Sequence, residues 1–352
     1  MPKDAAPFRG SCIFYVCSRW GRAHMPIKKA RPLLINSLFF RAMLVAHKGK
    51  AAHGGAPGEK RGIIMQDSLL SARRAGFSGT ALKSIALVLM LLDHIHYFFE
   101  FTGFIPIVFT MLGRLAAPLF LFCTVEGFLH THDRKRYFFR MLAISAPMGL
   151  LEFFMMYGGW FNRGDGFYPM NAIFMNFVVL CIVWQGIDWL RAKKWLPGLL
   201  AVLIPAVGWP VLSVLLLQAV PVPAMQNTLG ILYFTLLPNW MFITDGGWGY
   251  LLGGVILYLF HGNRKLQLSV WVIWTFWFEF IRIFMLLRGT DGFVWTQMFT
   301  DYFQWFEIFS VLLMALYNGQ RGSGHKSLFY WFYPVHVYVL YGASCLLYTA
   351  LH

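Results

Sequence analysis

Apolar residues are grouped in long runs from residue 79 onward, and short polar or basic segments separate the runs. Seven of these runs stand out, at residues 81–99, 115–129, 171–190, 196–220, 268–287, 302–317 and 328–351. Each is close to the roughly 20 residues that a helix needs to cross a hydrocarbon core about 30 Å thick. One such run could be a buried helix of a soluble protein, but seven cannot share one soluble core. The pattern predicts an all-α fold, a polytopic bundle of transmembrane helices.

Composition and charge agree with a membrane protein. The chain is 58% hydrophobic and only 13% charged, whereas soluble proteins average about 25% charged residues. Residues 1–78 hold 14 Lys/Arg and 3 Asp/Glu, net +11, and residues 79–352 hold 16 and 12, net +4. The high net charge therefore comes mostly from the N-terminal region, and we expect no nucleic-acid partner for the core. The five cysteines form no C-x-x-C pair, so no disulfide or metal framework is expected.

Residues 1–78 form a separate, basic N-terminal extension. They are rich in Gly, Ala and Pro and lack sustained periodicity, which is typical of a disordered segment. The apolar stretch at residues 33–46 allows the alternative of a targeting or membrane-surface segment. A third hypothesis is that translation starts at Met65, because residues 59–62 (EKRG) can be encoded almost wholly by purines, as a ribosome-binding site would be. We expect the functional membrane domain to occupy residues 79–352.

The basic residues predict the topology, because Lys and Arg stay on the cytoplasmic side of short loops. Basic clusters precede the first span, follow the second and fourth spans, and recur twice later: Arg73, Arg74 and Lys83; Arg134, Lys135, Arg136 and Arg140; Arg191, Lys193 and Lys194; Arg264 and Lys265; Arg321 and Lys326. The first three clusters place the N-terminus in the cytoplasm. All five share that side if residues 196–261 cross twice, with a re-entrant or interfacial piece near residues 226–243. The count is then nine spans, and ten is the alternative.

The first span carries Asp93 and His94 at bilayer depth. An ionisable side chain there costs roughly 2.5–3.5 kcal/mol on insertion scales and marks a functional site by default. Histidine suits general acid–base catalysis near neutral pH. Lys83 lies 11 residues earlier, so it shares a helix face with His94, about 16 Å nearer the cytoplasmic edge. Asp93 either orients His94 or pairs with another helix, and the alternative to catalysis is an Asp/His pair that joins helices.

The second span has Arg114 near its outer end and Glu126 near its inner end. The following H-x-H-D segment, residues 130–133, could be called metal-binding, but we interpret it as a polar exit from the membrane and expect no metal. Four basic residues come next: Arg134, Lys135, Arg136 and Arg140. They either obey the positive-inside rule alone or also bind the phosphates of a nucleotide-like donor, since Arg recognises phosphate bidentately.

Later spans add further polar candidates. Glu279 and Arg282 are spaced i,i+3, so we expect them to pair with each other as a structural feature. In the last span, Pro334 predicts a kink that frees a backbone carbonyl. His336 follows it and is the second histidine candidate, for which catalysis, ligand binding and packing all remain open.

Three separated segments resemble the TraX family. The first runs from Ser78-Gly79-Thr80-Ala81-Leu82-Lys83 to Leu92-Asp93-His94-Ile95. The second runs from Gly113-Arg114-Leu115-Ala116-Ala117-Pro118 to Val125-Glu126-Gly127-Phe128 and His130-Thr131. The third joins Leu316-Tyr317-Asn318-Gly319-Gln320-Arg321-Gly322 to Phe332-Tyr333-Pro334-Val335-His336. The resemblance covers residues 78–345, and residues 195–245 contribute little to it.

The resemblance implies a bacterial inner-membrane acetylase, since TraX is known as the acetylase of the pilin N-terminus in conjugation. The family also looks distantly similar to the acyltransferase-three membrane enzymes, which begin with a basic residue and a His about 11 positions on. The matching places are occupied by Lys83, His94, the turn at residues 127–129, and Arg136 and Arg140. Lys83 stands where those enzymes usually have Arg, and Glu126 where they often have Ser.

We therefore expect acetyl transfer from acetyl-CoA to an amine or hydroxyl acceptor, such as a pilin-like peptide or an envelope glycan. The expected donor-binding residues are Lys83, Arg134, Lys135, Arg136 and Arg140. The expected catalytic residues are His94 as general base, with Asp93 or Glu126 orienting it. Acceptor-binding or supporting roles are expected for His336, Asn318, Arg321 and Arg114.

Two other functions stay open at this point. A small-molecule transporter could use Asp93, His94, Glu126 and His336 as a proton relay. A non-catalytic membrane partner of a secretion or pilus apparatus is the third possibility.

Overall fold

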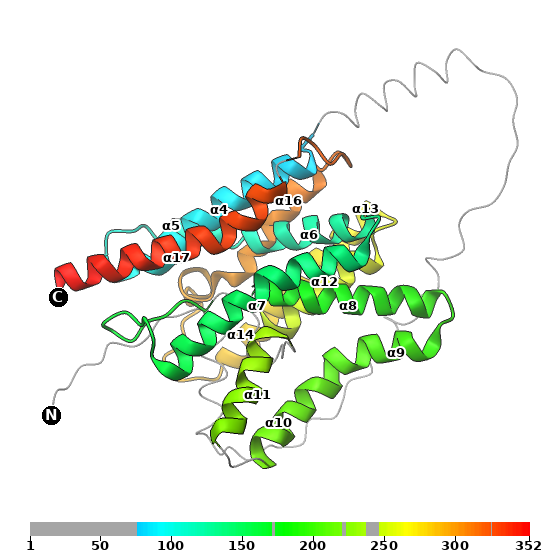
Figure 1. Ribbon diagram of the computed structural model, residues 1–352. Coiled ribbons are helices and arrows are strands. Elements are labelled where there is room, and N and C mark those ends of the chain that lie inside the picture. The colour runs from blue at the N-terminus through cyan, green and yellow to red at the C-terminus, as the bar shows by residue number, and fades with distance from the viewer. Residues whose placement is uncertain (1–75, 171–172, 220–222, 237–245, 325) are drawn as a thin grey trace, which may run out of the picture. The chain divides into compact units, whose positions relative to one another are not determined.

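The computed structural model describes residues 76–170, 173–219, 223–236, 246–324 and 326–352 (Figure 1). These residues form helices and no strands: α4 Gly79–Phe99, η1 Glu100–Thr102, α5 Val108–Gly113, α6 Ala116–Leu129, α7 Arg134–Gly158, α8 Ile173–Arg191, α9 Trp195–Leu203, η2 Ile204–Gly208, α10 Trp209–Ala219, α11 Pro223–Thr235, α12 Gly247–Leu259, α13 Arg264–Thr275, η3 Phe276–Ile281, α14 Arg282–Leu287, α15 Gln297–Thr300, η4 Phe303–Phe309, α16 Ser310–Ala315 and α17 Lys326–Leu351. The hypotheses about a disordered extension and a start at Met65 lie outside the described residues.

Seven helical segments of the described chain are long and apolar enough to cross a membrane. They are Gly79–Thr102, Val108–Leu129, Arg134–Gly158, Ile173–Arg191, Trp195–Leu216, Arg264–Leu287 and Leu328–Leu351. Two shorter apolar helices, Gly247–Leu259 and Phe303–Ala315, accompany them. The prediction of an all-α, polytopic transmembrane bundle is confirmed.

The helices α11 and α12 are each 13 residues long, about 20 Å, which is too short to cross the hydrocarbon core alone. Near its end, α11 approaches α7 so closely that a Cβ on Gly149 would overlap the backbone of Phe234. In α12, the Gly254 carbonyl accepts a hydrogen bond from Trp184 Nε1 of α8 at 3.2 Å. The helix α11 overlaps residues 226–243, where we predicted a re-entrant or interfacial piece, and α12 comes after that range; residues 237–245 lie outside the described chain.

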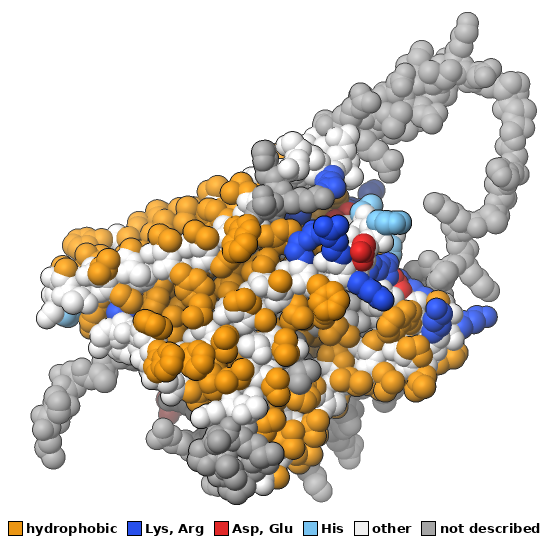
Figure 2. Space-filling view, in the orientation of Figure 1, with side chains coloured by type: hydrophobic (Ala, Val, Ile, Leu, Met, Phe, Trp, Pro, Cys, Tyr) orange, Lys and Arg blue, Asp and Glu red, His pale blue; other side chains and the backbone are white. Residues whose placement is uncertain are grey.

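Basic side chains gather at one end of the bundle, which we call the basic end (Figure 2). Contacts between helices define it: Arg134 of α7 lies 2.6 Å from Asp188 of α8, and Arg264 of α13 lies 2.8 Å from Glu126 of α6. Three helices begin with side-chain caps that satisfy first-turn N–H groups, as polar residues before an apolar run should. The caps are Ser78 for α4, Asp133 for α7 and Asn263 for α13.

A short strap ties the beginning of α4 to the segment between α16 and α17. The N–H of Phe77 donates to the Leu316 carbonyl at 2.8 Å, and the N–H of Asn318 donates back to the Phe77 carbonyl at 3.0 Å. The first N–H groups of α4, at Gly79 and Thr80, donate to carbonyls of residues 320 and 321. These donors lack partners inside their own helix. The strap therefore caps α4 and also fixes its beginning beside the segment between α16 and α17.

Glu279 and Arg282 interact electrostatically, as their i,i+3 spacing led us to expect. The segment Phe276–Ile281 is a π-helix, in which i→i+5 hydrogen bonds widen the turn. Arg282 also donates from Nε to the Phe278 carbonyl at 3.0 Å and lies over the Phe278 ring at 4.1 Å.

Thr80 provides a test of the strap. Its hydroxyl contacts the carbonyls of Arg321 at 2.9 Å and Ser323 at 2.8 Å. Thr80→Val keeps the shape and removes this interaction, so we expect a loss of about 1–2 kcal/mol in unfolding free energy, measured as a lower thermal midpoint in nanodiscs. Ser84→Ala, at an exposed position of the same helix, is the control. Equal midpoints for the two variants would contradict the strap's contribution.

Candidate functional site

Two buried histidines face each other between the first and last spans. His94 of α4 is 7% exposed and His336 of α17 is 6% exposed. Nδ1 of His94 lies 2.7 Å from Nε2 of His336, which is hydrogen-bond distance. The helices α4 and α17 run side by side along the bundle (Figure 1). The structure therefore joins two candidates that the sequence offered separately.

A backbone carbonyl next to His336 determines which imidazole nitrogens of the pair carry protons. Nδ1 of His336 lies 2.7 Å from the Phe332 carbonyl oxygen, which can only accept, so this nitrogen is a donor. In the neutral ring, Nε2 of His336 is then an acceptor, and the proton between the rings belongs to Nδ1 of His94. It follows that Nε2 of His94 carries the lone pair. The basic nitrogen of the pair is therefore Nε2 of His94, and the hydrogen bond at Nδ1 fixes the orientation of its ring.

Aromatic rings enclose the pair. The Phe98 ring stacks on His94 with centroids 5.9 Å apart, and Phe332 stacks on His336 at 4.8 Å. Tyr333 meets both imidazoles edge-on, at 6.2 Å from His94 and 5.7 Å from His336. These rings limit how far either imidazole can rotate.

Asp93 points to α5 and not into the histidine pair. Its Oδ1 accepts from the Thr110 hydroxyl at 2.6 Å and from Arg114 Nη2 at 2.8 Å. Gly113 permits this approach, because a Cβ there would overlap the Asp93 side chain. Adjacent helix positions point about 100° apart, which explains why Asp93 and His94 serve different neighbours.

The network continues into residues that sequence reasoning did not single out. Arg114 Nη1 donates to Gln304 Oε1 at 2.8 Å, and Gln304 Nε2 donates to Glu307 Oε1 at 3.2 Å. Glu307 is 6% exposed in η4. A carboxylate inside the apolar run 302–317 was the available sequence signal, because ionisable residues at that depth are rarely incidental.

Glu126 lies at the basic end and pairs there with Arg264 at 2.8 Å. The guanidinium of Arg264 also lies 4.5 Å from the Phe122 ring centroid. Nδ1 of His130 lies 2.8 Å from the Glu126 carbonyl, at the end of α6. Nδ1 of His94 contacts the His336 imidazole, whereas we expected the Asp93 or Glu126 carboxylate to orient His94.

The five expected donor-binding residues separate into three groups. Arg134 is held by Asp188 at 2.6 Å and by Gln185 at 3.0 Å. Lys135 and Arg136 are exposed at the start of α7. Lys83 and Arg140 converge on neighbouring rings of α17, with Lys83 Nζ 5.8 Å from the Phe329 centroid and the Arg140 guanidinium 5.6 Å from the Tyr330 centroid. The helix that carries His336 thus has two cations at its beginning.

Asn318 and Arg321 belong to the strap. Asn318 Nδ2 donates to the Gly76 carbonyl at 3.3 Å, and its Oδ1 accepts from the Gln320 N–H at 2.9 Å. The Arg321 carbonyl accepts from Thr80, while its side chain is exposed. These contacts give both residues a structural part at the basic end.

Comparison with known proteins decides the family. The family model described as TraX protein matches residues 78–344. The chain belongs to the TraX family. No curated protein and no solved structure matches it. The matched TraX region begins at the strap, at Ser78, and includes both histidines of the pair.

Replacing Asp93 tests the network next to the pair. Asp93→Asn removes the carboxylate charge that lies 2.8 Å from Arg114, and we expect a loss of about 1–3 kcal/mol in unfolding free energy because hydrogen bonds to charged groups are among the stronger ones. The measurement is the denaturation midpoint of the purified protein. Asp291→Asn, in an exposed loop position, is the matched control. An Asp93→Asn midpoint equal to that of the control would show that the ion pair adds no stability.

Proposed function

We propose that this TraX-family protein is a membrane acetyltransferase that moves an acetyl group from acetyl-CoA to an amine or hydroxyl acceptor. The acceptor class includes a pilin-like peptide or an envelope glycan. The basic end faces the cytoplasm of a bacterial inner membrane, in keeping with the positive-inside rule. The observation that carries the proposal is the hydrogen bond between His94 and His336 inside the bundle.

In this reaction His94 is the general base. Its Nε2 takes the proton of the acceptor amine or hydroxyl as that group attacks the thioester carbonyl. The C–S bond breaks, and the CoA thiolate leaves and receives the proton from His94. His336 accepts the Nδ1–H hydrogen bond throughout and stabilises the imidazolium, as an orienting group does in other acid–base pairs.

Lys83 and Arg140 are the proposed contacts of the donor phosphates. They approach the first turns of α17, at Phe329 and Tyr330. Lys83 stands about 16 Å along α4 from His94, and the pantetheine arm of CoA likewise separates its phosphates from its thioester. Lys135 and Arg136 add positive charge at the same end. Arg134 is less suited to bind the donor phosphates, because Asp188 already neutralises its charge.

The enclosed position of the pair favours transfer over hydrolysis. His94 and His336 are buried among Phe98, Phe332 and Tyr333. Water at such a site is scarce, so the thioester is protected and the hydrogen bond to the imidazolium is strengthened.

A transporter with a proton relay is the competing function. The observation that favours it is the hydrogen-bonded series from Asp93 through Arg114 and Gln304 to Glu307. Networks of ionisable side chains within the spans occur in proton-coupled transporters. Substrate uptake by proteoliposomes without release of CoA would support it over acetyl transfer.

Substitution of the two histidines tests the proposed mechanism. His94→Gln removes the base, and we expect acetyl transfer to fall by about 10²–10⁴-fold. His336→Gln can still accept from Nδ1 of His94, so the loss should be smaller than for His336→Ala. CoA release by purified protein is the measurement, with a panel of amine and hydroxyl acceptors. His132→Gln, at an exposed position, is the control, and normal turnover by His94→Gln would exclude the mechanism.

Variants of Arg140 and Arg134 distinguish an effect on donor binding from an effect on stability. Arg140→Gln should raise the KM for acetyl-CoA by about tenfold, because one phosphate contact is worth roughly 1–2 kcal/mol. Arg134→Gln should leave this KM unchanged and lower the unfolding midpoint, since it breaks the bond to Asp188. Steady-state kinetics and thermal unfolding of both variants give the comparison. A higher KM for Arg134→Gln alone would reverse the assignment.

A further inference from the structure

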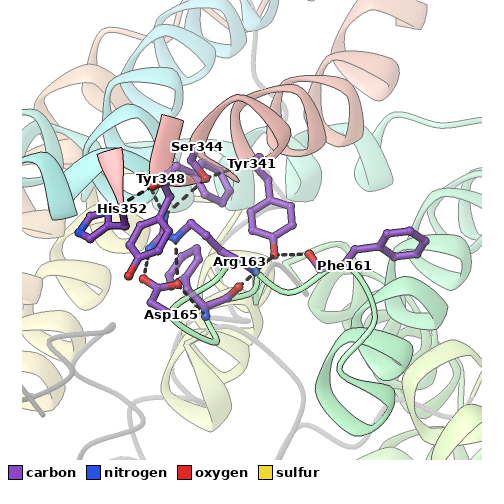
Figure 3. Close-up of polar contacts among 9 residues, drawn as sticks. Phe161, Arg163, Asp165, Tyr341, Ser344, Tyr348 and His352 are labelled. Carbon is purple, nitrogen blue, oxygen red and sulfur yellow. Dashed lines mark hydrogen bonds and ion pairs between the residues drawn. The ribbon is translucent and has the colours of Figure 1, made fainter. Parts of the chain in front are cut away.

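Arg163 is a buried cation at the end of the bundle opposite the basic end, in the segment between α7 and α8. Its side chain is 5% exposed. Figure 3 shows it between that segment and the C-terminal turns of α17, with Asp165, Tyr341, Ser344 and Tyr348 around it. A charge so far from water needs full hydrogen bonding to be tolerated. Its partners therefore reveal which parts of the fold it holds.

The guanidinium bonds two spans and its own loop. Nη1 donates to the Phe98 carbonyl of α4 at 2.8 Å and to Ser344 Oγ of α17 at 3.4 Å. Nε and Nη2 form a fork on Asp165, at 3.0 and 2.8 Å. Phe98 is the penultimate residue of α4, so its carbonyl has no partner within the helix.

Asp165 is the counter-charge. Burial by itself raises the pKa of the Asp165 carboxyl, but the hydrogen bonds from Arg163 and the Phe167 N–H, with the Arg163 charge, bring that pKa below its usual value. Asp165 is therefore a carboxylate at neutral pH. The contribution of this carboxylate to stability is present at neutral pH and is lost as the pH falls through the lowered pKa.

Aromatic rings and a tyrosine hydroxyl complete the arrangement. The guanidinium lies 4.3 Å from the Phe167 centroid and 4.5 Å from the Phe101 centroid, at distances typical of cation–π contacts. The Tyr341 hydroxyl donates to the Phe161 carbonyl at 2.7 Å and accepts from the backbone N–H of Arg163 at 3.1 Å. Arginine suits this position because its planar guanidinium donates at once to Phe98, Ser344 and Asp165.

The same two spans carry the histidine pair. Phe98 comes one turn after His94 and stacks on it, and Tyr341 and Ser344 follow His336 in α17. At the basic end, the strap joins the start of α4 to the segment that leads into α17. The histidine contact thus lies between two attachments, one made by backbone hydrogen bonds and one made by Arg163.

We propose that Arg163 is a positioning residue for the His94–His336 pair. By binding the last turn of α4 and the C-terminal part of α17, it holds the two imidazoles at hydrogen-bond distance. Its effect on catalysis rests on the proposed acetyl transfer, whereas its effect on the histidine contact does not. The chemistry needs this attachment because a displacement of about 1 Å can cost about 100-fold in rate.

The test is Arg163→Lys in full-length protein in nanodiscs, with Arg288→Gln as the control at an exposed position after α14. In ¹⁵N-histidine-labelled protein, the scalar coupling between Nδ1 of His94 and Nε2 of His336 reports their shared proton. We expect Arg163→Lys to lose this coupling, since lysine keeps the charge but cannot form the fork. The kcat for acetyl transfer should fall about 10- to 100-fold, with the KM for acetyl-CoA unchanged.

An unchanged coupling and an unchanged kcat in folded Arg163→Lys would overturn the proposal. If that variant does not fold, Ser344→Ala removes only the weaker link to α17 and should reduce the coupling, while an unchanged coupling there overturns the proposal as well. If wild-type protein shows no acetyl transfer with any acceptor, the proposed function fails, but the coupling still tests the role of Arg163.

Discussion

A hydrogen bond between two imidazoles on different spans is the interaction on which the functional interpretation depends. It requires α4 and α17 to keep His94 and His336 about 2.7 Å apart, and hydrogen bonds weaken quickly beyond about 3.2 Å. Neither helix can ensure this alone. The strap at the basic end and Arg163 at the opposite end fasten the same two helices on either side of the pair.

This constraint also explains why three distant segments carry the family resemblance. The first segment contains Ser78 through Lys83, and the third contains the residues to which they hydrogen-bond across the strap. Asp93 of the first segment binds Arg114 of the second, and His94 of the first meets His336 of the third. The segments are separate in the chain because each lies on a different span, and they are partners in the fold.

The ion pairs at the basic end and the hydrogen-bonded series within the spans involve different residues. At the basic end, Glu126 and Asp188 neutralise Arg264 and Arg134, which leaves Lys83 and Arg140 near α17 as the proposed donor contacts. Away from the basic end, one hydrogen-bonded series contains Asp93, Arg114 and Glu307. Buried ions are stable only with partners, so the pairs indicate which cations are structural.

The sequence by itself determined the fold class, the long spans and the candidate histidines and aspartate within those spans. Span length and hydrophobicity depend on consecutive residues, so they are readable without knowing any neighbour. Only the tertiary structure decided that His336 and not a carboxylate contacts Nδ1 of His94, and that Arg163 joins two spans. Those contacts depend on which faces of separate helices pack together, and residues 65 to 242 positions apart along the chain make them.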